Sequence, residues 1–562
     1  MFNAVKQETK MNPHTIKAQL TKLTTLKPHE EVDPKHLQKL KSKIESDGIL
    51  KLAIVADKNT NVILDGEHRY TALKELGCKT IPVVFVDYNS PQIEVQSWKG
   101  NPHLTKKDVI EAGLSGRKLP PKTSKHMVKF DTQLAHISII QKRVDAPLDI
   151  LKGEVKLLDI KAVKPIPQTN LKVTLAAYAK LTKTGIVEDP IIIDEEINGI
   201  LAGHEIYQAL DLLQAKKIPA LRISQKQRQN IAKIKNLKIN VALEELLAAE
   251  EENKRLLKVY GSTLELLHEN WPTPLVKLNS LSTETRSVWA KLEGYNPFSN
   301  SVKDRIGWAM INEALARKEL KEILYEATST NTGIALTSIA NILGFKTKLY
   351  IPMTVQKVSD IYLKVLGSEV VRLPVGLTVE AISKVDSEAK LDGAAHLNQF
   401  ENDANFKVHL KYTASEIDAQ IRSQGLKPTC IIGGLGTSGH MSAISFYFKN
   451  KYKNNVKIIG VQPAPNEVIP GIRRIETGMK WYHWTKFDSI IEVKQAEAIE
   501  GAIQIARKEG ILIGLSAGAV VHAFHQIAKA KGVYILIFPD TGFKYAEQFQ
   551  KYFETNPTTI SG

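Results

Sequence analysis

The residues that decide the fold class are 296–305, which read NPFSNSVKDR, because they place Lys303 where a helix is expected to begin. Ile306 and Met310 follow at helical spacing and predict an apolar face on that helix. About one helix later, residues 327–333 read ATSTNTG, a loop rich in hydroxyl and amide groups before a second helical run. Such a loop offers hydrogen-bond donors to an anion at a helix start. A lysine beside it is suited to forming a Schiff base with a carbonyl cofactor.

Four further motifs follow in order. They are QFEN at 399–402, GLGTSG at 434–439, GILIGLSAG at 510–518 and PDTG at 539–542. Together the six stretches resemble the cysteine synthase family, pyridoxal-phosphate enzymes of fold type II, whose first two patterns read roughly NPTGSVKDR and TSGNTG. The resemblance runs from about residue 271 to 545. It implies two doubly wound α/β subdomains, a pyridoxal 5′-phosphate cofactor and a homodimer.

The resemblance also implies a role for each matching residue. Lys303 would bind the cofactor as a Schiff base and later remove the substrate α-proton. Contacts to the cofactor would come from Asn331, Gly436, Thr437, Ser438, Gly439 and Ser516. The substrate carboxylate would be held by Thr328, Ser329, Thr332 and Gln399. Two positions depart from the family pattern, Thr330 in place of glycine and His440 in place of threonine, and the sequence leaves their roles open.

The leaving group is suggested by residues 469–474, which read IPGIRR. Family members that use acetylserine carry an uncharged segment there, roughly HKIQGIG, whereas members that use phosphoserine resemble PGIRR. An arginine pairs bidentately with a phosphate and gains little from an acetyl ester. We therefore expect Arg473, or failing that Arg474, to bind the phosphate of O-phospho-L-serine.

Composition sets the broad class of the protein. A chain of 562 residues with 43% hydrophobic and 24% charged residues is expected to form several globular domains. The net charge of +16 is spread over scattered lysines without a nucleic-acid-binding signature, so we give little weight to nucleic-acid binding. Cys78 and Cys430 show no disulfide or metal-ligand spacing. We find no membrane span or signal peptide and expect a cytoplasmic protein.

The front half contains a duplicated α/β pattern. A helix ending near Gly48, strands at 53–56 and 62–64, a helix from Tyr70 and a strand at 81–86 are predicted. The same order recurs 137 residues later, where Leu64 aligns with Leu201. The second copy keeps the apolar positions and loses the polar ones, which suggests that the polar residues of the first copy serve a function.

The first copy resembles the ParB/sulfiredoxin-like fold and, within it, the free L-serine kinases, which make O-phospho-L-serine from serine and a nucleotide. Glu30 would be the general base, with Glu31 as the alternative. The nucleotide would be bound by Asp65, Gly66, Glu67, His68 and Arg69, with Asp65 also contacting Mg²⁺. The family usually has histidine at Glu67, so its role is open. Serine or its phosphoryl group would be contacted by Trp98, Lys122, Thr123 and His126.

These patterns predict four segments. They are a serine kinase domain (1–130), a degenerate second copy (131–225), a helical linker (226–265) and a cysteine synthase-like domain (266–562). The two halves suggest a bifunctional enzyme that phosphorylates L-serine with ADP or ATP and Mg²⁺, then replaces the phosphate by sulfide to give L-cysteine. Alternatives are an acetylserine-using or cystathionine-forming enzyme whose front half senses a nucleotide or binds DNA. The sequence does not identify the phosphoryl donor, which could also be pyrophosphate, or the sulfur donor.

Overall fold

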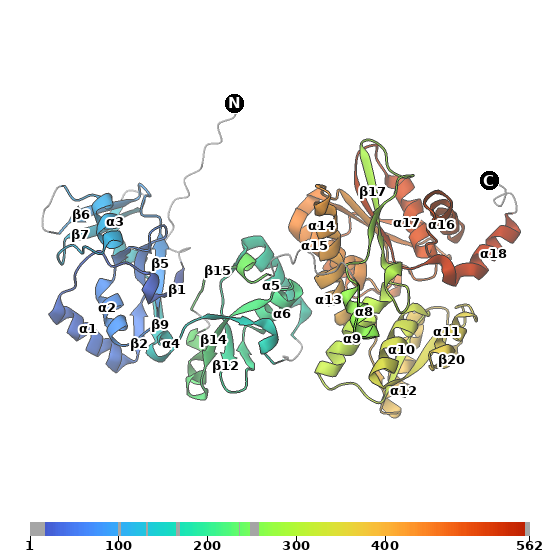
Figure 1. Cartoon of the computed structure of the whole chain (residues 1–562), viewed down its shortest axis with the longest axis horizontal. Helices are drawn as coiled ribbons and strands as arrows, with labels where there is room; N and C mark the ends of the chain where they lie inside the picture. The colour runs from blue at the N-terminus through green and yellow to red at the C-terminus, as the bar shows by residue number, and fades with distance from the viewer. Residues whose placement is uncertain are drawn as a thin grey trace. The chain divides into compact units, whose positions relative to one another are not determined.

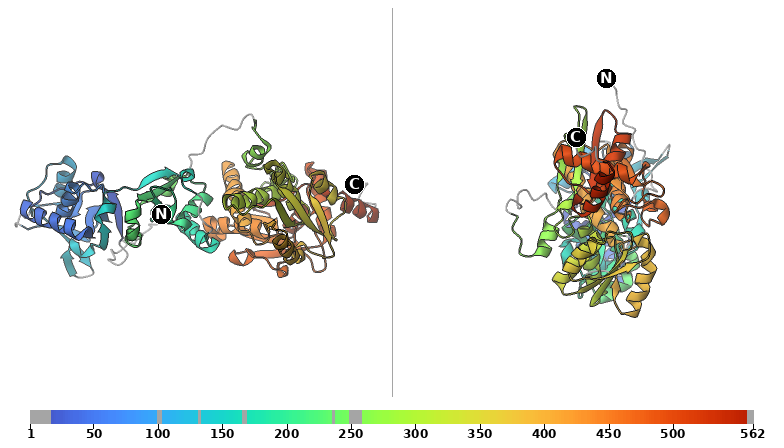
Figure 2. Two further views of the ribbon diagram at one scale, coloured as in Figure 1. Left: turned by 90° about the horizontal axis from the view of Figure 1, so that it is seen from below. Right: turned by 90° about the vertical axis from the view of Figure 1, so that its right-hand side faces the viewer.

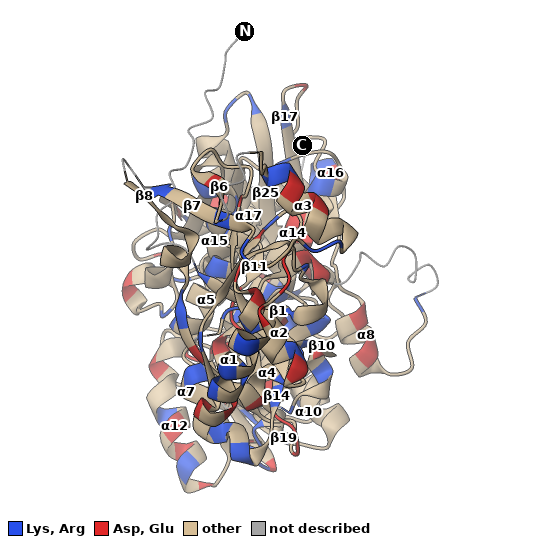
Figure 3. Cartoon of the chain, turned by 90° about the vertical axis from the view of Figure 1, so that its left-hand side faces the viewer, with Lys and Arg blue, Asp and Glu red and all other residues tan. Residues whose placement is uncertain are grey.

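A computed structural model of the chain describes residues 17–98, 103–130, 133–164, 169–234, 237–247 and 258–556. The chain divides between residues 250 and 251 into two compact units, each built from strands and helices (Figure 1). No helix among the described residues is both long and apolar enough to cross a membrane. Positions of basic and acidic residues are interspersed along the ribbon in Figure 3, as expected for scattered lysines.

The first copy of the repeat is a four-stranded sheet of order β1-β5-β3-β4. Its strands are Ala18–Lys22 (β1), Ile54–Asp57 (β3), Ile63–Asp65 (β4) and Thr80–Val86 (β5), and its helices are Pro34–Asp47 (α1) and Glu67–Glu75 (α2). The central pair β3 and β5 is parallel, whereas β1 and β4 run antiparallel to their neighbours. Helix α1 ends at Gly48 in the left-handed conformation, which confirms the predicted stop.

The second copy repeats this topology strand for strand, in the order β10-β14-β12-β13. Its elements are Lys156–Asp159 (β10), Leu171–Thr184 (α5), Ile191–Asp194 (β12), Ile200–Ala202 (β13), His204–Leu212 (α6) and Lys217–Ile223 (β14). Strands β12 and β14 are parallel, and the two outer strands are antiparallel. The predicted duplication is therefore confirmed.

The predicted boundary at residue 130 cuts through paired strands and needs correction. Gln133–His136 (β8) pairs with Ser124–Phe130 (β7), and Arg143–Pro147 (β9) pairs with Ile49–Leu52 (β2) of the first copy. A single core then combines side chains of both copies, among them Ile54, Leu73, Leu151, Ile192 and Leu221. The first copy thus extends to about residue 147, and the two copies share one hydrophobic core.

The predicted helical linker at 226–265 needs correction at residues 237–242, which form no helix. Val241–Ala242 (β15) pairs with Ile186–Val187 (β11) of the second copy, and Leu243 and Leu246 are buried. Leu243 begins a short 3-10 turn and Leu246 follows it, so their spacing reflects that single turn rather than a longer helix. The acidic run at 250–252 lies outside the described residues.

The second unit contains two sheets, as the resemblance implied. The larger has the order β16-β17-β25-β22-β23-β24 and the smaller β20-β19-β18-β21. The larger comprises Leu275–Lys277 (β16), Arg286–Leu292 (β17), Cys430–Gly434 (β22), Lys457–Pro463 (β23), Ser489–Val493 (β24) and Gly532–Phe538 (β25). The smaller comprises Ile323–Ala327 (β18), Lys346–Pro352 (β19), Glu369–Leu373 (β20) and Ala395–His396 (β21). All pairings are parallel except that of β16 with β17.

Helices surround these sheets and carry the motifs. They include Lys303–Ala316 (α9), Asn331–Leu343 (α10), Ser359–Val365 (α11), Ser415–Ser423 (α14), Gly439–Tyr452 (α15), Gln495–Glu509 (α16) and Leu515–Ile527 (α17). The small sheet with α10 and α11 forms one lobe and the large sheet with α15 to α17 the other, which the views of Figure 2 also show. Several motifs follow directly after strands, so parallel pairing collects them at one edge of the sheets.

A buried ion cluster fixes the first turn of α9. Arg305, whose side chain is fully buried, donates to Glu293 at 2.6 and 3.0 Å and to Glu416 at 2.8 and 2.7 Å. Lys291 donates to the same Glu416 at 2.8 Å and to the carbonyl oxygen of Thr273 at 2.8 Å. Every charge in the cluster has an opposite partner, which offsets the cost of removing these groups from water.

Removal of the central cation should destabilise the second unit strongly. Arg305→Met leaves Glu293 and Glu416 buried near one remaining lysine, so we expect a loss of about 3–5 kcal/mol in the free energy of unfolding. The control is Arg317→Met at the C-terminal end of the same helix, which breaks a pair with Glu313 near the surface and should cost about 0–1 kcal/mol. Urea denaturation monitored by tryptophan fluorescence measures both. Equal losses in the free energy of unfolding for the two variants would show that the cluster does not stabilise the unit more than a surface ion pair does.

Candidate active site

One cavity of the second unit brings together residues from distant motifs. Its lining includes Lys303, Ser329, Thr330, Asn331, Thr332, Gln399, Gly436, Thr437 and Arg473. Thr328 lies buried at the base of its loop, where its hydroxyl accepts the backbone N–H groups of Thr330 and Gly333 at 3.1 and 3.0 Å. Ser516, in the first turn of α17, is also buried. Lys303 therefore shares one cavity with the predicted substrate loop and glycine turn.

The loop before α9 holds Lys303 at its helix start. The buried carboxylate of Asp304 accepts the backbone N–H groups of Phe298 and Ser299 at 2.7 and 2.8 Å. The N–H of Lys303 donates to Ser301 Oγ at 3.1 Å. These bonds satisfy backbone groups that a helix start leaves without intrahelical partners. The loop and the first turn thus form one hydrogen-bonded unit from which the lysine side chain enters the cavity.

The environment of Lys303 favours the neutral amine. Burial lowers the pKa of Lys303 to about 8, the carboxylate of Asp540 opposes this shift, and the ammonium of Lys544 adds to it. A lysine with a pKa near 8 has a substantial neutral fraction at physiological pH, and only the neutral amine can attack a carbonyl or accept a proton.

Asn331 is held between a cation and an anion. Lys544 Nζ donates to Asn331 Oδ1 at 2.5 Å, and Asn331 Nδ2 donates to Asp540 Oδ2 at 2.9 Å. Tyr545 also donates to Asp540, at 2.5 Å. Lys544 and Tyr545 were not predicted from the sequence. Their position just after the PDTG motif could have identified them as candidate site residues. The amide keeps one N–H for a ligand, in agreement with the role implied for Asn331.

The glycine turn at 436–439 suits a phosphate group. A Cβ atom on Gly436 would lie 2.6 Å from the carbonyl oxygen of Gly471, and one on Gly439 would lie 2.4 Å from Asn405 Oδ1. Side chains are therefore excluded where backbone N–H groups begin α15. Ser438 Oγ is buried and has no hydrogen-bond partner among the described residues. A small backbone cradle with an unused donor at a helix start fits the phosphate of the implied cofactor.

Thr332 and Gln399, which both belong to the lobe of the small sheet, are linked at the predicted carboxylate site. Thr332 Oγ1 donates to Gln399 Oε1 at 2.7 Å, and Gln399 Nε2 donates to the carbonyl oxygen of Ala327 at 2.9 Å. Ser329 is exposed at the cavity. These bonds fix the orientation of the Gln399 amide, so the arrangement is preorganised rather than dependent on a ligand.

The two candidate arginines have different environments. Arg473 lines the cavity, donates Nε to the carbonyl oxygen of Gly436 at 2.9 Å and donates Nη1 to Thr477 Oγ1 at 2.7 Å. Its Nη2 has no hydrogen-bond partner within the described part of the chain. Arg474 instead pairs with Glu476 at 3.0 Å and Glu492 at 2.8 Å near the surface. Only Arg473 therefore offers a free donor to a ligand in the cavity.

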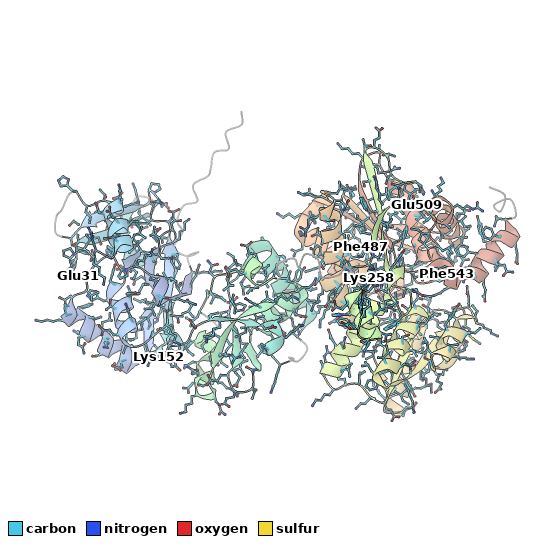
Figure 4. The ribbon with its side chains drawn as sticks, in the orientation of Figure 1. Glu31, Lys152, Lys258, Phe487, Glu509 and Phe543 are labelled. Carbon is cyan, nitrogen blue, oxygen red and sulfur yellow. The ribbon has the colours of Figure 1, made fainter. Side chains whose placement is uncertain are left out.

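Glu30 lies in a polar cluster of the first unit. Its carboxylate accepts the backbone N–H and the hydroxyl of Ser124, both at 2.5 Å, and the N–H of Lys122 at 3.2 Å. Burial opposes ionisation, but His29 and these donors lower the pKa of Glu30, which is therefore a carboxylate at neutral pH. Glu31, which is labelled in Figure 4, is exposed. Of the two alternatives for the general base, Glu30 is therefore the one held in a polar cluster, and Glu31 is the one exposed to solvent.

His29, which the sequence reasoning did not single out, organises this cluster. Its Nε2 contacts Ser124 Oγ at 2.7 Å, and its Nδ1 lies 2.8 Å from Glu67 Oε1 and 2.6 Å from the carbonyl oxygen of Ile63. Burial disfavours the charged ring, but the carboxylates of Glu67 and Glu30 raise the pKa of His29 to about 10. Glu67 is thus the counter-ion of a buried imidazolium, which accounts for a carboxylate at a position where the family usually has histidine.

The predicted nucleotide turn is closely packed. Arg69 donates Nη2 to Asp65 at 2.8 Å and Nη1 to the carbonyl oxygen of Ala53 at 2.8 Å, so its guanidinium is largely committed to the protein. Gly66 has a φ of +111°, and a Cβ there would lie 2.4 Å from Ile54. His68 Nε2 accepts the N–H of Asp33 at 3.1 Å, which connects the starts of α1 and α2. Two helix starts therefore lie close together, and a helix start favours the binding of an anion such as phosphate.

Burial lowers the pKa of His68 and raises that of Asp65, so both groups tend toward their neutral forms. Among the described residues, no group of three or more histidine, cysteine or acidic side chains is arranged to hold a metal ion. Any Mg²⁺ at Asp65 would therefore depend on oxygen atoms supplied by the nucleotide and water.

The other predicted serine contacts differ in accessibility. Lys122 is exposed, and Thr123 Oγ1 donates to the carbonyl oxygen of Pro120 at 2.6 Å. Trp98 is 55% exposed, with Lys125 Nζ 4.6 Å from its ring centroid, so it is not a core residue. His126 is only 2% exposed, and burial lowers its pKa to about 3. Contact between His126 and a phosphoryl group would require the core to open.

The neutral fraction of Lys303 should control how fast the protein without cofactor condenses with added pyridoxal phosphate. The rate should rise between pH 7 and 9 as Lys303 loses its proton, then level off. Lys544→Met removes a neighbouring positive charge, so it should raise the pKa of Lys303 and shift this profile to higher pH. Lys508→Met at the surface is the control. Stopped-flow absorbance measures the rates. An unshifted pH profile in Lys544→Met would contradict the conclusion that the charge of Lys544 lowers the pKa of Lys303.

Comparison with known proteins agrees with this geometry. Residues 266–539 match the family described as pyridoxal-phosphate dependent enzyme, and residues 3–97 match the ParB N-terminal domain. Cysteine synthase B of Escherichia coli (strain K12) is 35% identical over 294 residues, which cover 50% of this chain and 94% of that protein. Cysteine synthase of Aquifex aeolicus (strain VF5) is 34% identical over 291 residues, which cover 49% of this chain and 88% of that protein.

A solved structure of O-ureido-L-serine synthase matches with a TM-score of 0.48 and 26% identity, covering 53% of this chain and 96% of that one. The identities to the two cysteine synthases extend over nearly the full length of those proteins. They coincide with the unit in which Lys303, the hydroxyl-rich loop and the glycine turn share a cavity. The chain therefore belongs to the family of pyridoxal-phosphate-dependent enzymes that includes the cysteine synthases, and it carries a ParB N-terminal domain at its start.

Proposed function

We propose that this chain catalyses two consecutive reactions, phosphorylation of free L-serine to O-phospho-L-serine and replacement of that phosphate by sulfide to give L-cysteine. The observation that carries the proposal is Arg473, which lines the Lys303 cavity with an unused Nη2 donor. A buried guanidinium has little to gain from an acetyl ester and much to gain from a phosphate. A kinase that acts on free serine would supply such a substrate, and the first copy of the repeat resembles the free L-serine kinases.

In the second unit, this chain's residues bind the substrate and move its proton. Thr332 and Gln399 would hold the α-carboxylate, and neutral Lys303 would take the α-proton. The Cβ–O bond breaks, Arg473 receives the departing phosphate, sulfide forms the new Cβ–S bond, and a proton returns to Cα. Bound pyridoxal phosphate supplies the electron sink for the carbanion. Ser516 is uncharged and would leave the pyridine nitrogen unprotonated, which favours elimination over transamination.

In the first unit, Glu30 would orient the serine hydroxyl and accept its proton as the oxygen attacks the terminal phosphoryl group of ADP or ATP. Phosphoryl transfer depends mainly on positioning and charge neutralisation, so a carboxylate with a low pKa is an adequate base. The starts of α1 and α2 would bind the nucleotide phosphates, with Mg²⁺ at Asp65. We also propose that the protein forms a homodimer and that the phosphoryl donor is ADP or ATP.

The first test is cysteine formation from serine, sulfide, Mg²⁺ and each nucleotide in turn, compared with formation from phosphoserine and sulfide. Glu30→Gln should reduce serine-dependent cysteine formation by about 10²–10⁴-fold while phosphoserine-dependent formation stays within twofold. Glu45→Gln on the exposed face of α1 is the control. Undiminished serine phosphorylation by Glu30→Gln would rule out this residue as the base. Failure of the unmodified protein with every nucleotide would favour a regulatory role for the first unit.

The second test concerns the leaving group. Arg473→Met should raise the KM for phosphoserine by about tenfold to a hundredfold, because one charge-assisted hydrogen bond is lost, and should change the KM for acetylserine little. Arg474→Met removes only surface pairs and should leave both values near those of the unmodified protein. Steady-state kinetics with both substrates measures the difference. Equal effects of Arg473→Met on the two substrates would contradict phosphate recognition.

A further inference from the structure

Thr330 has a backbone conformation that a β-branched residue rarely adopts. Its φ is +121° and its ψ −61°, immediately before α10 begins at Asn331. The allowed region at positive φ is narrow for any residue with a Cβ, and the family pattern has glycine at this position. Strain of this kind persists only where the surroundings enforce it, and it concentrates at functional sites.

Hydrogen bonds on both sides enforce this conformation. The N–H of Thr330 donates to Thr328 Oγ1 at 3.1 Å, and its carbonyl oxygen accepts the N–H of Ile334 at 2.9 Å. The residue therefore cannot relax without breaking the start of α10. A glycine would meet the same backbone requirement with less strain, so the conformation alone does not explain why a threonine is present.

The Thr330 side chain points to a ligand. It is 5% exposed, it lines the cavity that contains Lys303, and its Oγ1 has no hydrogen-bond partner among the residues that the structure describes. Buried hydroxyl groups are nearly always hydrogen-bonded, because losing water without gaining a partner is unfavourable. Thr330 therefore combines two unfavourable features, backbone strain and an unsatisfied donor, at one point of the cavity.

Other donors in this cavity are also unused. Gln356, which follows β19, lines it with both polar atoms of its side-chain amide buried and without partners in the described part of the chain. The Nη2 group of Arg473 is free in the same sense. Thr330 also stands at the start of α10, a helix of 13 residues whose first N–H groups favour negative charge. The surroundings of the hydroxyl thus favour an anionic oxygen as its partner.

We infer that Thr330 is a substrate-binding residue whose hydroxyl donates to an anionic oxygen of the amino-acid substrate, either of its α-carboxylate or of its phosphate ester. The inference rests on the proposed function for its substrate and adds a contact that the glycine of the family pattern cannot make. Binding satisfies the hydroxyl, so the substrate offsets part of the cost of keeping a threonine in this conformation.

The test compares two variants of the enzyme loaded with pyridoxal phosphate. Thr330→Val keeps the shape and branching but lacks the hydroxyl, and it should raise the KM for phosphoserine by about tenfold to a hundredfold with kcat changed less than threefold. Thr330→Ser keeps the hydroxyl and should stay within about threefold of the unmodified enzyme. Equal KM values for all three proteins, or equal losses in both variants, would overturn the inference.

Acetylserine distinguishes the two anionic groups. A raised KM for phosphoserine alone in Thr330→Val assigns the contact to the phosphate ester, and a raised KM for both substrates assigns it to the α-carboxylate. Weaker binding of pyridoxal phosphate with unchanged KM values would place the hydroxyl on the cofactor and overturn the inference. If the unmodified enzyme ignores phosphoserine, the proposed function fails, and the acetylserine measurements still test the carboxylate contact.

Thermal melting supplies a readout that does not depend on turnover. In the absence of substrate, Thr330→Gly relieves the strain and removes the unsatisfied hydroxyl, so its Tm should rise by roughly 2 °C or more. Saturating phosphoserine should then raise the Tm of Thr330→Gly less than that of the unmodified enzyme, because the variant lacks the contact. A lower Tm without substrate together with an undiminished shift would show that Thr330 is only a structural residue.

Discussion

The chemistry of the second unit depends on the buried ion cluster around Arg305. This residue stands two positions after Lys303 in the first turn of α9, and its guanidinium is clamped by Glu293 from the end of β17 and by Glu416 from α14. Because three separate elements meet at one cation, the lysine cannot shift without unpairing buried charges. Asp304 adds hydrogen bonds from the preceding loop. The enzyme thus positions a mobile amine by fixing the backbone that carries it.

The two candidate sites treat hydrogen-bonding groups differently. Around Glu30, Ser124, His29 and Glu67 pair within the protein in one connected cluster, although Nε2 of the neighbouring His126 is buried without a partner among the described residues. In the Lys303 cavity, two lining residues, Thr330 and Gln356, keep buried groups without partners in the described part of the chain. The first arrangement stabilises a fixed carboxylate, and the second is completed by a substrate. If the phosphorylated product of one site is the substrate of the other, their presence on one chain raises the local concentration of that intermediate.

The success of the sequence predictions follows from the kind of information each one used. Lys303, Asn331 and the glycine turn line one cavity because they belong to motifs of fixed spacing that parallel strands bring to one sheet edge, and their roles stay predictions. The duplication was recognised for a similar reason, since its apolar positions recur at a constant offset. His29 and Ser124 were not singled out because their contact joins residues 95 positions apart and depends on the packing of strand β7. The linker prediction failed at residues 237–242 because Leu243 and Leu246 belong to one short 3-10 turn after a strand, which local spacing does not distinguish from a long helix.

The most direct measurement of the proposed two-step route follows the oxygen atom of serine. When the enzyme is given L-serine labelled with ¹⁸O in its hydroxyl group, together with a nucleotide, Mg²⁺ and sulfide, phosphorylation places that oxygen in the ester, and replacement releases it with the phosphate. The account predicts inorganic phosphate that carries one ¹⁸O atom per cysteine formed, visible as an isotope shift in the ³¹P spectrum. Cysteine formed with the label in water, or with unlabelled phosphate, would contradict it.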